Sequence, residues 1–193
     1  MPASMCASLG QKLIEVGQRH RCEEAYSRGV TFVPGVINYE QSFSEFLADD
    51  RVLTLAEALL GPNVRISYTS ALLNEPGNKR SKWHADWPFN QNRAGHIPAP
   101  YPDATAYILT LWMLSPFTIE TGGTLIVPRS HRASNNPTGN NGVDPAVSYP
   151  TETQALGEAG SVLILDGRLW HSTAPNHTDI PRVAIRVTYA PVW

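Results

Sequence analysis

Two residues near the middle of the chain, His84 and Asp86, have the spacing of a metal-binding pair. In an extended segment the side chains of residues i and i+2 point to the same face, so an imidazole and a carboxylate can converge while Ala85 faces away. The pair alone is a weak signal, because His-x-Asp also arises by chance. A second, distant histidine would complete a face of two histidines and one carboxylate with open coordination positions, which is diagnostic of non-haem Fe(II) oxygenases.

His171 is the candidate for the second histidine. It follows a glycine-led apolar strand at residues 160–165 and the turn Asp166-Gly167, which places it where a returning strand re-enters the mouth of a barrel. Arg182 begins the next strand eleven residues later, and an antiparallel neighbour would bring it beside His171. A guanidinium at that position is suited to hold a carboxylate through two parallel hydrogen bonds.

The elements that must position these residues change in character along the chain. Up to residue 60 the apolar spacing predicts helices over 4–20 and 42–60, with a short strand at 31–37 that contains Pro34-Gly35. Beyond that point short strands are expected at 64–69, 106–114, 124–127, 161–165 and 182–189. Two helical elements followed by many short strands favour a mainly β sandwich or jelly roll with an N-terminal helical layer.

Length and composition limit the class of protein. The 193 residues suit one domain over 1–193, with helices and a strand at 1–60 and a core at 64–191. A net charge of −2 gives no footprint for nucleic acid. No apolar run is long enough to span a membrane, and residues 1–20 carry three charges and no signal-peptide pattern, so a cytoplasmic protein is expected. The two cysteines form no CxxC pair, which gives no support to a cysteine zinc site.

Three stretches of the sequence resemble the phytanoyl-CoA dioxygenase family of Fe(II)- and 2-oxoglutarate-dependent oxygenases. They are His84-x-Asp86, the strand Leu111-Trp112-Met113 with the segment from Glu120 to His131, and His171 followed by Asn176 and Arg182. The resemblance covers about residues 28 to 191 and implies a double-stranded β-helix, or jelly roll. It also implies roles for individual residues: iron ligands His84, Asp86 and His171, Arg182 on the distal carboxylate of 2-oxoglutarate, and Trp112 in the co-substrate pocket.

The sequence also departs from the family pattern. Arg129 stands where the family has the glycine of a Pro-Gly-Ser-His turn, which puts the geometry of that turn in question. The chain is short for the family, so a C-terminal extension that shapes the substrate pocket is expected to be missing. Neither departure affects a proposed iron ligand.

The resemblance implies a dioxygenase that uses Fe(II), 2-oxoglutarate and O2 to hydroxylate an unactivated C–H bond of a small molecule, with release of succinate and CO2. Because Asp86 fills the carboxylate position, no site is left for chloride, so hydroxylation or desaturation is expected rather than halogenation. Two alternatives stay open. One is a non-catalytic or sensing jelly roll that binds metal, and the other is a cupin-like metalloenzyme that does not use 2-oxoglutarate. Cupins usually bring more histidines to the metal and need no arginine like Arg182.

Two loops are expected to shape the substrate pocket, since loops at the mouth of a jelly roll carry its specificity. Residues 87–105 leave directly from the metal pair, and residues 132–150, rich in Asn and Gly, suit a mobile lid. The expected pocket residues are Trp87, Phe89, Gln91 and His96. This mix of apolar and polar side chains favours a small metabolite with polar substituents.

Overall fold

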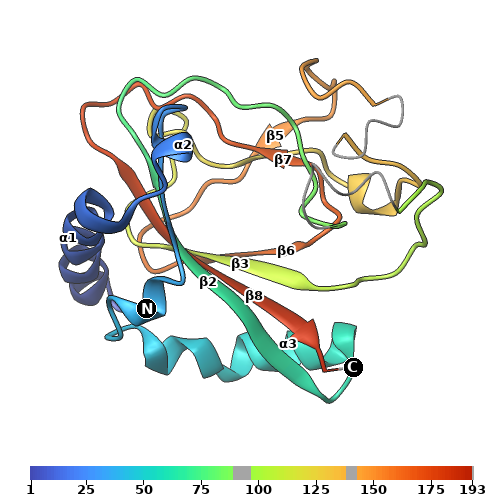
Figure 1. Ribbon diagram of the computed structural model, residues 1–193, viewed down its shortest axis with the longest axis horizontal. Helices are drawn as coiled ribbons and strands as arrows, with labels where there is room; N and C mark the ends of the chain where they lie inside the picture. The colour runs from blue at the N-terminus through green and yellow to red at the C-terminus, as the bar shows by residue number, and fades with distance from the viewer. Residues whose placement is uncertain (89–96, 138–142, 193) are drawn as a thin grey trace.

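A computed structural model describes residues 1–88, 97–137 and 143–192 of the protein (Figure 1). The N-terminal part contains α1 (Ala3–His20), α2 (Glu23–Tyr26), β1 (Val30–Pro34), the 3-10 helices η1 (Val36–Asn38) and η2 (Ser44–Ala48), and α3 (Asp50–Leu60). The other described residues contain β2 (Val64–Asn74), β3 (Ile108–Met113), β4 (Leu125–Ile126), η4 (Ser130–Arg132), β5 (Thr153–Gln154), β6 (Val162–Asp166), β7 (His171–Ser172) and β8 (Arg182–Pro191).

These strands form two antiparallel sheets. The larger sheet has the order β1-β2-β8-β3-β6, and the smaller sheet has the order β5-β4-β7. In the larger sheet β2 and β8 pair along their whole length, with Asn74 opposite Arg182 and Ser70 opposite Arg186. Two antiparallel sheets of short strands, preceded in the sequence by helices, form the jelly roll that the sequence predicts.

Side-chain alternation divides the larger sheet into two faces. Helices α1 and α3 lie against one face (Figure 1). There the apolar side of α1 packs on alternate residues of β2 and β8, and the buried set includes Leu9, Leu13, Ala71, Leu73, Val183, Ile185 and Val187. The intervening residues of the same strands face the smaller sheet, because successive side chains of a strand point to opposite sides. The face of the larger sheet that the helices do not cover can therefore contribute side chains to a site between the two sheets.

The prediction of one helix over 42–60 is wrong in one respect, because the helical conformation is interrupted at Asp49. The residue has extended backbone angles (φ −60°, ψ 121°) and its carboxylate accepts a hydrogen bond from the backbone N–H of Arg51. Asp49 is thus the N-cap of α3, which satisfies one of the free donors at the start of a helix. The preceding turns form the separate helix η2.

No helix in the part of the chain that the structure describes is both long enough and apolar enough to cross a membrane.

Candidate metal centre

The two histidines predicted to bind metal lie side by side on neighbouring backbone segments. His84 and His171 form an antiparallel bridge, in which each backbone N–H donates to the carbonyl of the other at 3.1 Å and 2.9 Å. Their rings are 4.3 Å apart between centroids. The backbone carbonyl of Leu169 lies 2.8 Å from His171 Nδ1, which leaves Nε2 to face the neighbouring side chains.

Asp86 completes the group, as the two-residue spacing predicts. Its Oδ1 lies 3.8 Å from His84 Nε2 and 3.9 Å from His171 Nε2. The three potential ligand atoms all lie within 4.8 Å of one another. Two imidazole nitrogens and one carboxylate oxygen on one side of a cavity are the donor set that a divalent iron with open positions needs, so the residues present fit Fe(II).

The two oxygens of Asp86 have different neighbours. Oδ1 faces the two histidines, whereas Oδ2 lies 2.8 Å from the guanidinium of Arg186. Arg186 belongs to β8, where it stands opposite Ser70 of β2 and Leu111 of β3. The larger sheet therefore holds one oxygen of the carboxylate and leaves the other for a cation.

The surroundings hold His84 and Asp86 in the protonation states that bind metal. Burial, followed by the nearby His171, holds the pKa of His84 below its ordinary value, so its imidazole is neutral and can donate a lone pair to a cation. Burial alone would raise the pKa of Asp86, but nearby positive charge, chiefly that of Arg186, holds that pKa below its ordinary value. A neutral histidine and an ionised carboxylate are the forms that coordinate metal.

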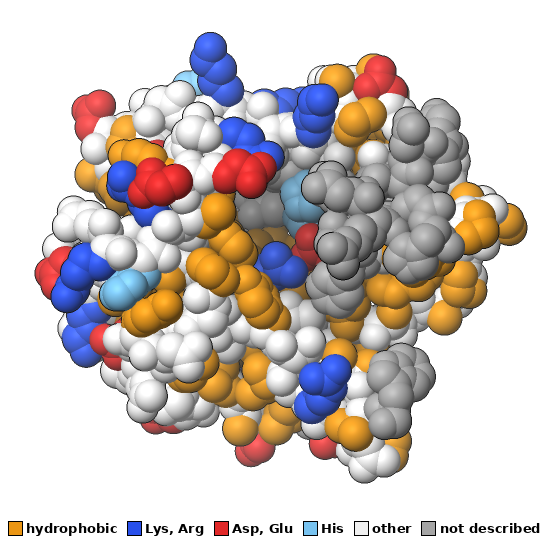
Figure 2. Space-filling view, in the orientation of Figure 1, with side chains coloured by type: hydrophobic (Ala, Val, Ile, Leu, Met, Phe, Trp, Pro, Cys, Tyr) orange, Lys and Arg blue, Asp and Glu red, His pale blue; other side chains and the backbone are white. Residues whose placement is uncertain are grey.

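These groups line a cavity of about 120 Å³ between the two sheets. Figure 2 shows the hollow on this face of the molecule, with cationic, acidic and histidine side chains visible inside it. The cavity is large enough for several water molecules or a small organic acid. The smaller sheet and its neighbouring segment contribute His84, Asp86, Thr124, His171, Ser172 and Thr173, and the larger sheet contributes Val30, Leu72, Asn74, Leu109, Leu111, Arg182, Ala184 and Arg186.

Arg182 has the surroundings of an anion-binding residue. It is 6% exposed, and its guanidinium lies 4.0 Å from the centre of the Phe117 ring. Among the residues that the structure describes it has no ion-pair partner, and its Nε has no hydrogen-bond acceptor. Burial lowers the pKa of Arg182 to about 9, which leaves the group protonated at neutral pH. A buried cation that has an aromatic ring but no ion-pair partner beside it is costly, so an anion bound in the cavity would stabilise it.

The predicted route by which Arg182 reaches the cavity is wrong. His171 belongs to β7, which pairs with β4, whereas Arg182 belongs to β8, which pairs with β2 and β3. The two residues therefore face each other from different sheets. The turn between them depends on Asn176, whose side chain donates to the carbonyls of Asn74 and Ile180 at 2.8 Å and 2.9 Å.

The predicted role of Trp112 is also wrong. Its side chain is buried in the cluster between the larger sheet and the helices, where it lies 5.8 Å from the ring of Phe46 and donates to Thr110 Oγ1. Strand alternation explains this outcome, because Leu109 and Leu111 of the same strand line the cavity.

The expected substrate residues have different outcomes. Trp87 does not line the described cavity but packs beside it, with its ring 5.4 Å from that of Tyr101. Phe89, Gln91 and His96 lie outside the described residues. The described parts of the predicted lid, residues 132–137 and 143–150, contribute nothing to the cavity wall, and Ala133, Val143 and Tyr149 pack on the outer side of the smaller sheet. Those parts of the loop are not a lid.

Three residues in or beside the cavity have roles that the sequence did not predict. Asn74 lines it at the end of β2, where a polar residue ends an apolar run, and this was the available signal. Arg186 lies four residues after Arg182 on the same strand, and it pairs with Asp86. Nothing in the sequence marks Phe117 as the ring against which Arg182 lies.

The turn that contains Arg129 keeps a left-handed conformation without glycine. Arg129 has φ 70° and is the only non-glycine residue with positive φ in the described parts of the chain. A side chain in this region costs about 1–2 kcal/mol, partly offset because glycine loses more entropy on folding.

We therefore expect Arg129→Gly to stabilise the protein by up to about 1 kcal/mol in a urea melt, with unchanged metal binding. A lower stability of this variant would show that the arginine side chain makes contacts worth more than the backbone strain.

Comparison with known proteins gives the class to which this site belongs. The family model for phytanoyl-CoA dioxygenase (PhyH) matches residues 20–184, and the chain belongs to that family. Dioxygenase af480 of Aspergillus fumigatus is 30% identical over 146 residues, which cover 75% of this chain and 43% of that protein. A probable alpha-ketoglutarate-dependent hypophosphite dioxygenase of Stutzerimonas stutzeri is 26% identical over 166 residues, which cover 79% of this chain and 54% of that protein. The chain thus spans about half the length of these relatives.

Solved structures share the fold over nearly the whole chain. HygX from Streptomyces hygroscopicus, solved with nickel and 2-oxoglutarate, has a TM-score of 0.73 at 19% identity and covers 100% of this chain and 80% of its own. The epimerase SnoN, solved with Fe3+, alpha ketoglutarate and nogalamycin RO, has a TM-score of 0.73 at 21% identity and covers 99% and 76%. The predicted jelly roll is confirmed by these likenesses.

Proposed function

We propose that this chain is an Fe(II)- and 2-oxoglutarate-dependent dioxygenase that acts on a small molecule. The observation that carries the proposal is the placement of two complementary groups in one cavity. A His-Asp-His cluster suited to Fe(II) lies on one wall, and Arg182, a buried arginine without an ion-pair partner among the described residues, lies on the other. Membership of the phytanoyl-CoA dioxygenase family supports the same assignment.

Each group has a defined task in this proposal. His84, Asp86 and His171 hold the iron, and Arg182 binds the distal carboxylate of 2-oxoglutarate with a charge-assisted pair of hydrogen bonds. With both bound, the iron and the co-substrate supply the activation of O2 that hydroxylates a C–H bond and yields succinate and CO2. Arg186 keeps Asp86 turned towards the histidines, and the apolar side chains Leu109 and Leu111 limit water beside the ligands.

Two alternatives are less well supported. A cupin-like enzyme that does not use 2-oxoglutarate has no need for a buried arginine that lacks an ion-pair partner among the described residues, as Arg182 does. A sensing protein that binds only metal has no need for it either. Hydroxylation is the proposed outcome. Because one structural neighbour is an epimerase, the product of the reaction is to be identified directly, for example by its mass. We further propose a substrate with polar substituents, because the wall of the cavity carries Asn74, Thr124 and Arg186 beside its apolar residues.

The test combines binding and turnover. Under anaerobic conditions the apo protein should bind one Fe(II) per chain, and 2-oxoglutarate added afterwards should produce a visible metal-to-ligand charge-transfer absorption. After O2 is admitted, succinate should form slowly, and a screen of metabolites should find compounds that accelerate it. Iron binding without the absorption band or succinate would leave the metal site in place but contradict the proposed co-substrate.

A further inference from the structure

The residues immediately before the two histidines are both tryptophans on the outer side of the smaller sheet. Trp83 and Trp170 are 2% and 9% exposed and belong to one buried cluster, which shares no residue with the cavity wall. Successive side chains of an extended segment point to opposite sides. A tryptophan fixed on the outside therefore determines the direction in which the next histidine enters the cavity.

One side chain contacts both tryptophans. The ring of Tyr149 lies 5.8 Å from that of Trp83 and 5.3 Å from that of Trp170, at interplanar angles of 69° and 59°. Tilted aromatic pairs at this separation are favourable beyond the area that they bury. Tyr149 thus links the two backbone segments on the side opposite to the metal ligands.

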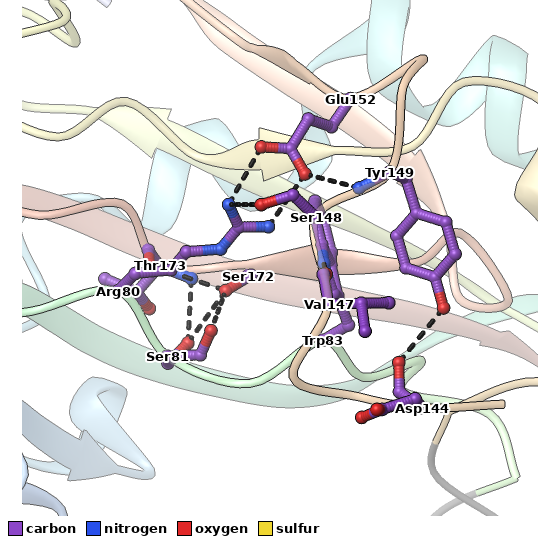
Figure 3. A network of polar contacts seen from close by, with 10 residues as sticks. All are labelled: Arg80, Ser81, Trp83, Asp144, Val147, Ser148, Tyr149, Glu152, Ser172 and Thr173. Carbon is purple, nitrogen blue, oxygen red and sulfur yellow. Dashed lines mark hydrogen bonds and ion pairs between the residues drawn. The ribbon is translucent and has the colours of Figure 1, made fainter.

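Polar contacts attach the rest of this segment to the same place (Figure 3). The backbone N–H and the indole N–H of Trp83 donate to the carbonyls of Pro145 and Val147, both at 2.8 Å. Arg80 and Glu152 form two parallel hydrogen bonds of 2.8 Å each. Glu152 also accepts the backbone N–H of Tyr149 at 2.9 Å. The carboxylate therefore ties Tyr149 to the segment that leads into His84.

Residues 143–152 line no part of the cavity, so they can act on the metal only through the residues that they contact next to the two histidines, which include both tryptophans and Arg80. We propose that this segment, here called the outer brace, positions both iron-binding histidines from behind the smaller sheet, with Tyr149 and Glu152 as positioning residues. The inference rests on the proposed iron site and extends it. Side chains that orient metal ligands typically change metal affinity by about 10–100-fold when replaced.

The first test compares two replacements of Tyr149 in the full chain. Co(II), which reports its coordination through visible absorption, is titrated into the apo protein at a temperature where melting curves show every variant folded. We expect Tyr149→Ala to raise the Co(II) dissociation constant about tenfold and to change the visible spectrum. Tyr149→Phe keeps the ring between the tryptophans and should stay within about twofold of the unmodified protein. Equal affinities for all three proteins, or equal losses in both variants, would overturn the role of the ring.

The second test addresses the ion pair and does not depend on Tyr149→Ala being folded. Arg80→Ala and Glu152→Ala should each weaken Co(II) binding about three- to tenfold, and the double variant should lose less than the product of the two effects because the residues act as one unit. The matched control is Arg51→Ala, which removes a 2.7 Å ion pair with Asp49 on α3 and should leave Co(II) binding unchanged. Unchanged affinity in both single variants would refute the brace. Failure of the unmodified protein to bind Co(II) or Fe(II) would instead refute the proposed function.

Discussion

Alanine in place of His84, Asp86 or His171 is expected to weaken Fe(II) binding by more than the ~10–100-fold that changes around the ligands usually cost. The three side chains are the only group of potential metal ligands found among the described residues, and each supplies one atom. With three protein ligands there is no spare donor to take over. Anaerobic Fe(II) titration of each variant, with iron counted per chain, measures the effect.

The control for this series is His177→Ala, since His177 is exposed and its backbone N–H, not its ring, bonds to Glu120. It should keep full iron occupancy. Asp86→Ala needs an additional measurement, because it leaves Arg186 without its partner in the cavity. A urea melt of the apo variants separates this loss of stability from the loss of a ligand. If all three ligand variants retained full occupancy, the iron would have to bind elsewhere.

The part of the site that the sequence predicts well is the part fixed by local geometry. His84 and Asp86 converge because two residues apart in an extended segment share a face. Arg182 and Arg186 both line the cavity for the same reason, since they are four apart on one strand. Such predictions require only that a segment is extended, and not which other segments pack against it.

What the sequence does not predict depends on packing between distant segments. Alternation places Thr110 and Trp112 on one face of β3, but only the position of the helices decides whether that face meets the core or the cavity. The assignment of Trp112 to the pocket failed at this step. The outer brace is a second case, because Arg80 and Glu152 are 72 positions apart and no periodic pattern pairs them. A loop rich in Asn and Gly suggests mobility, yet its described part is tied to the smaller sheet.

Removal of the Arg182 guanidinium is expected to raise the concentration of 2-oxoglutarate needed for half-maximal binding at least tenfold. A charge-assisted, two-point contact with a carboxylate is worth roughly 1.5–3 kcal/mol, which corresponds to about 10–150-fold in affinity. Arg182→Met is the sharper variant than alanine, because it keeps an unbranched side chain against Phe117. Titration of 2-oxoglutarate into metal-loaded protein gives the dissociation constant directly.

The comparison with Arg186 decides which arginine anchors the co-substrate. Arg186 is already paired with Asp86, so Arg186→Met should weaken iron binding and affect 2-oxoglutarate less than Arg182→Met does. Arg182→Lys keeps the charge but replaces the planar pair of donors by a single ammonium group. Its affinity for 2-oxoglutarate should lie between those of the unmodified protein and Arg182→Met. The apo form of Arg182→Met should lose little stability, because burial of an unpaired cation is unfavourable in the first place. A larger effect of Arg186→Met than of Arg182→Met on the 2-oxoglutarate requirement would reverse the assignment, and the unpaired guanidinium of Arg182 would then have to bind an anionic group of the substrate.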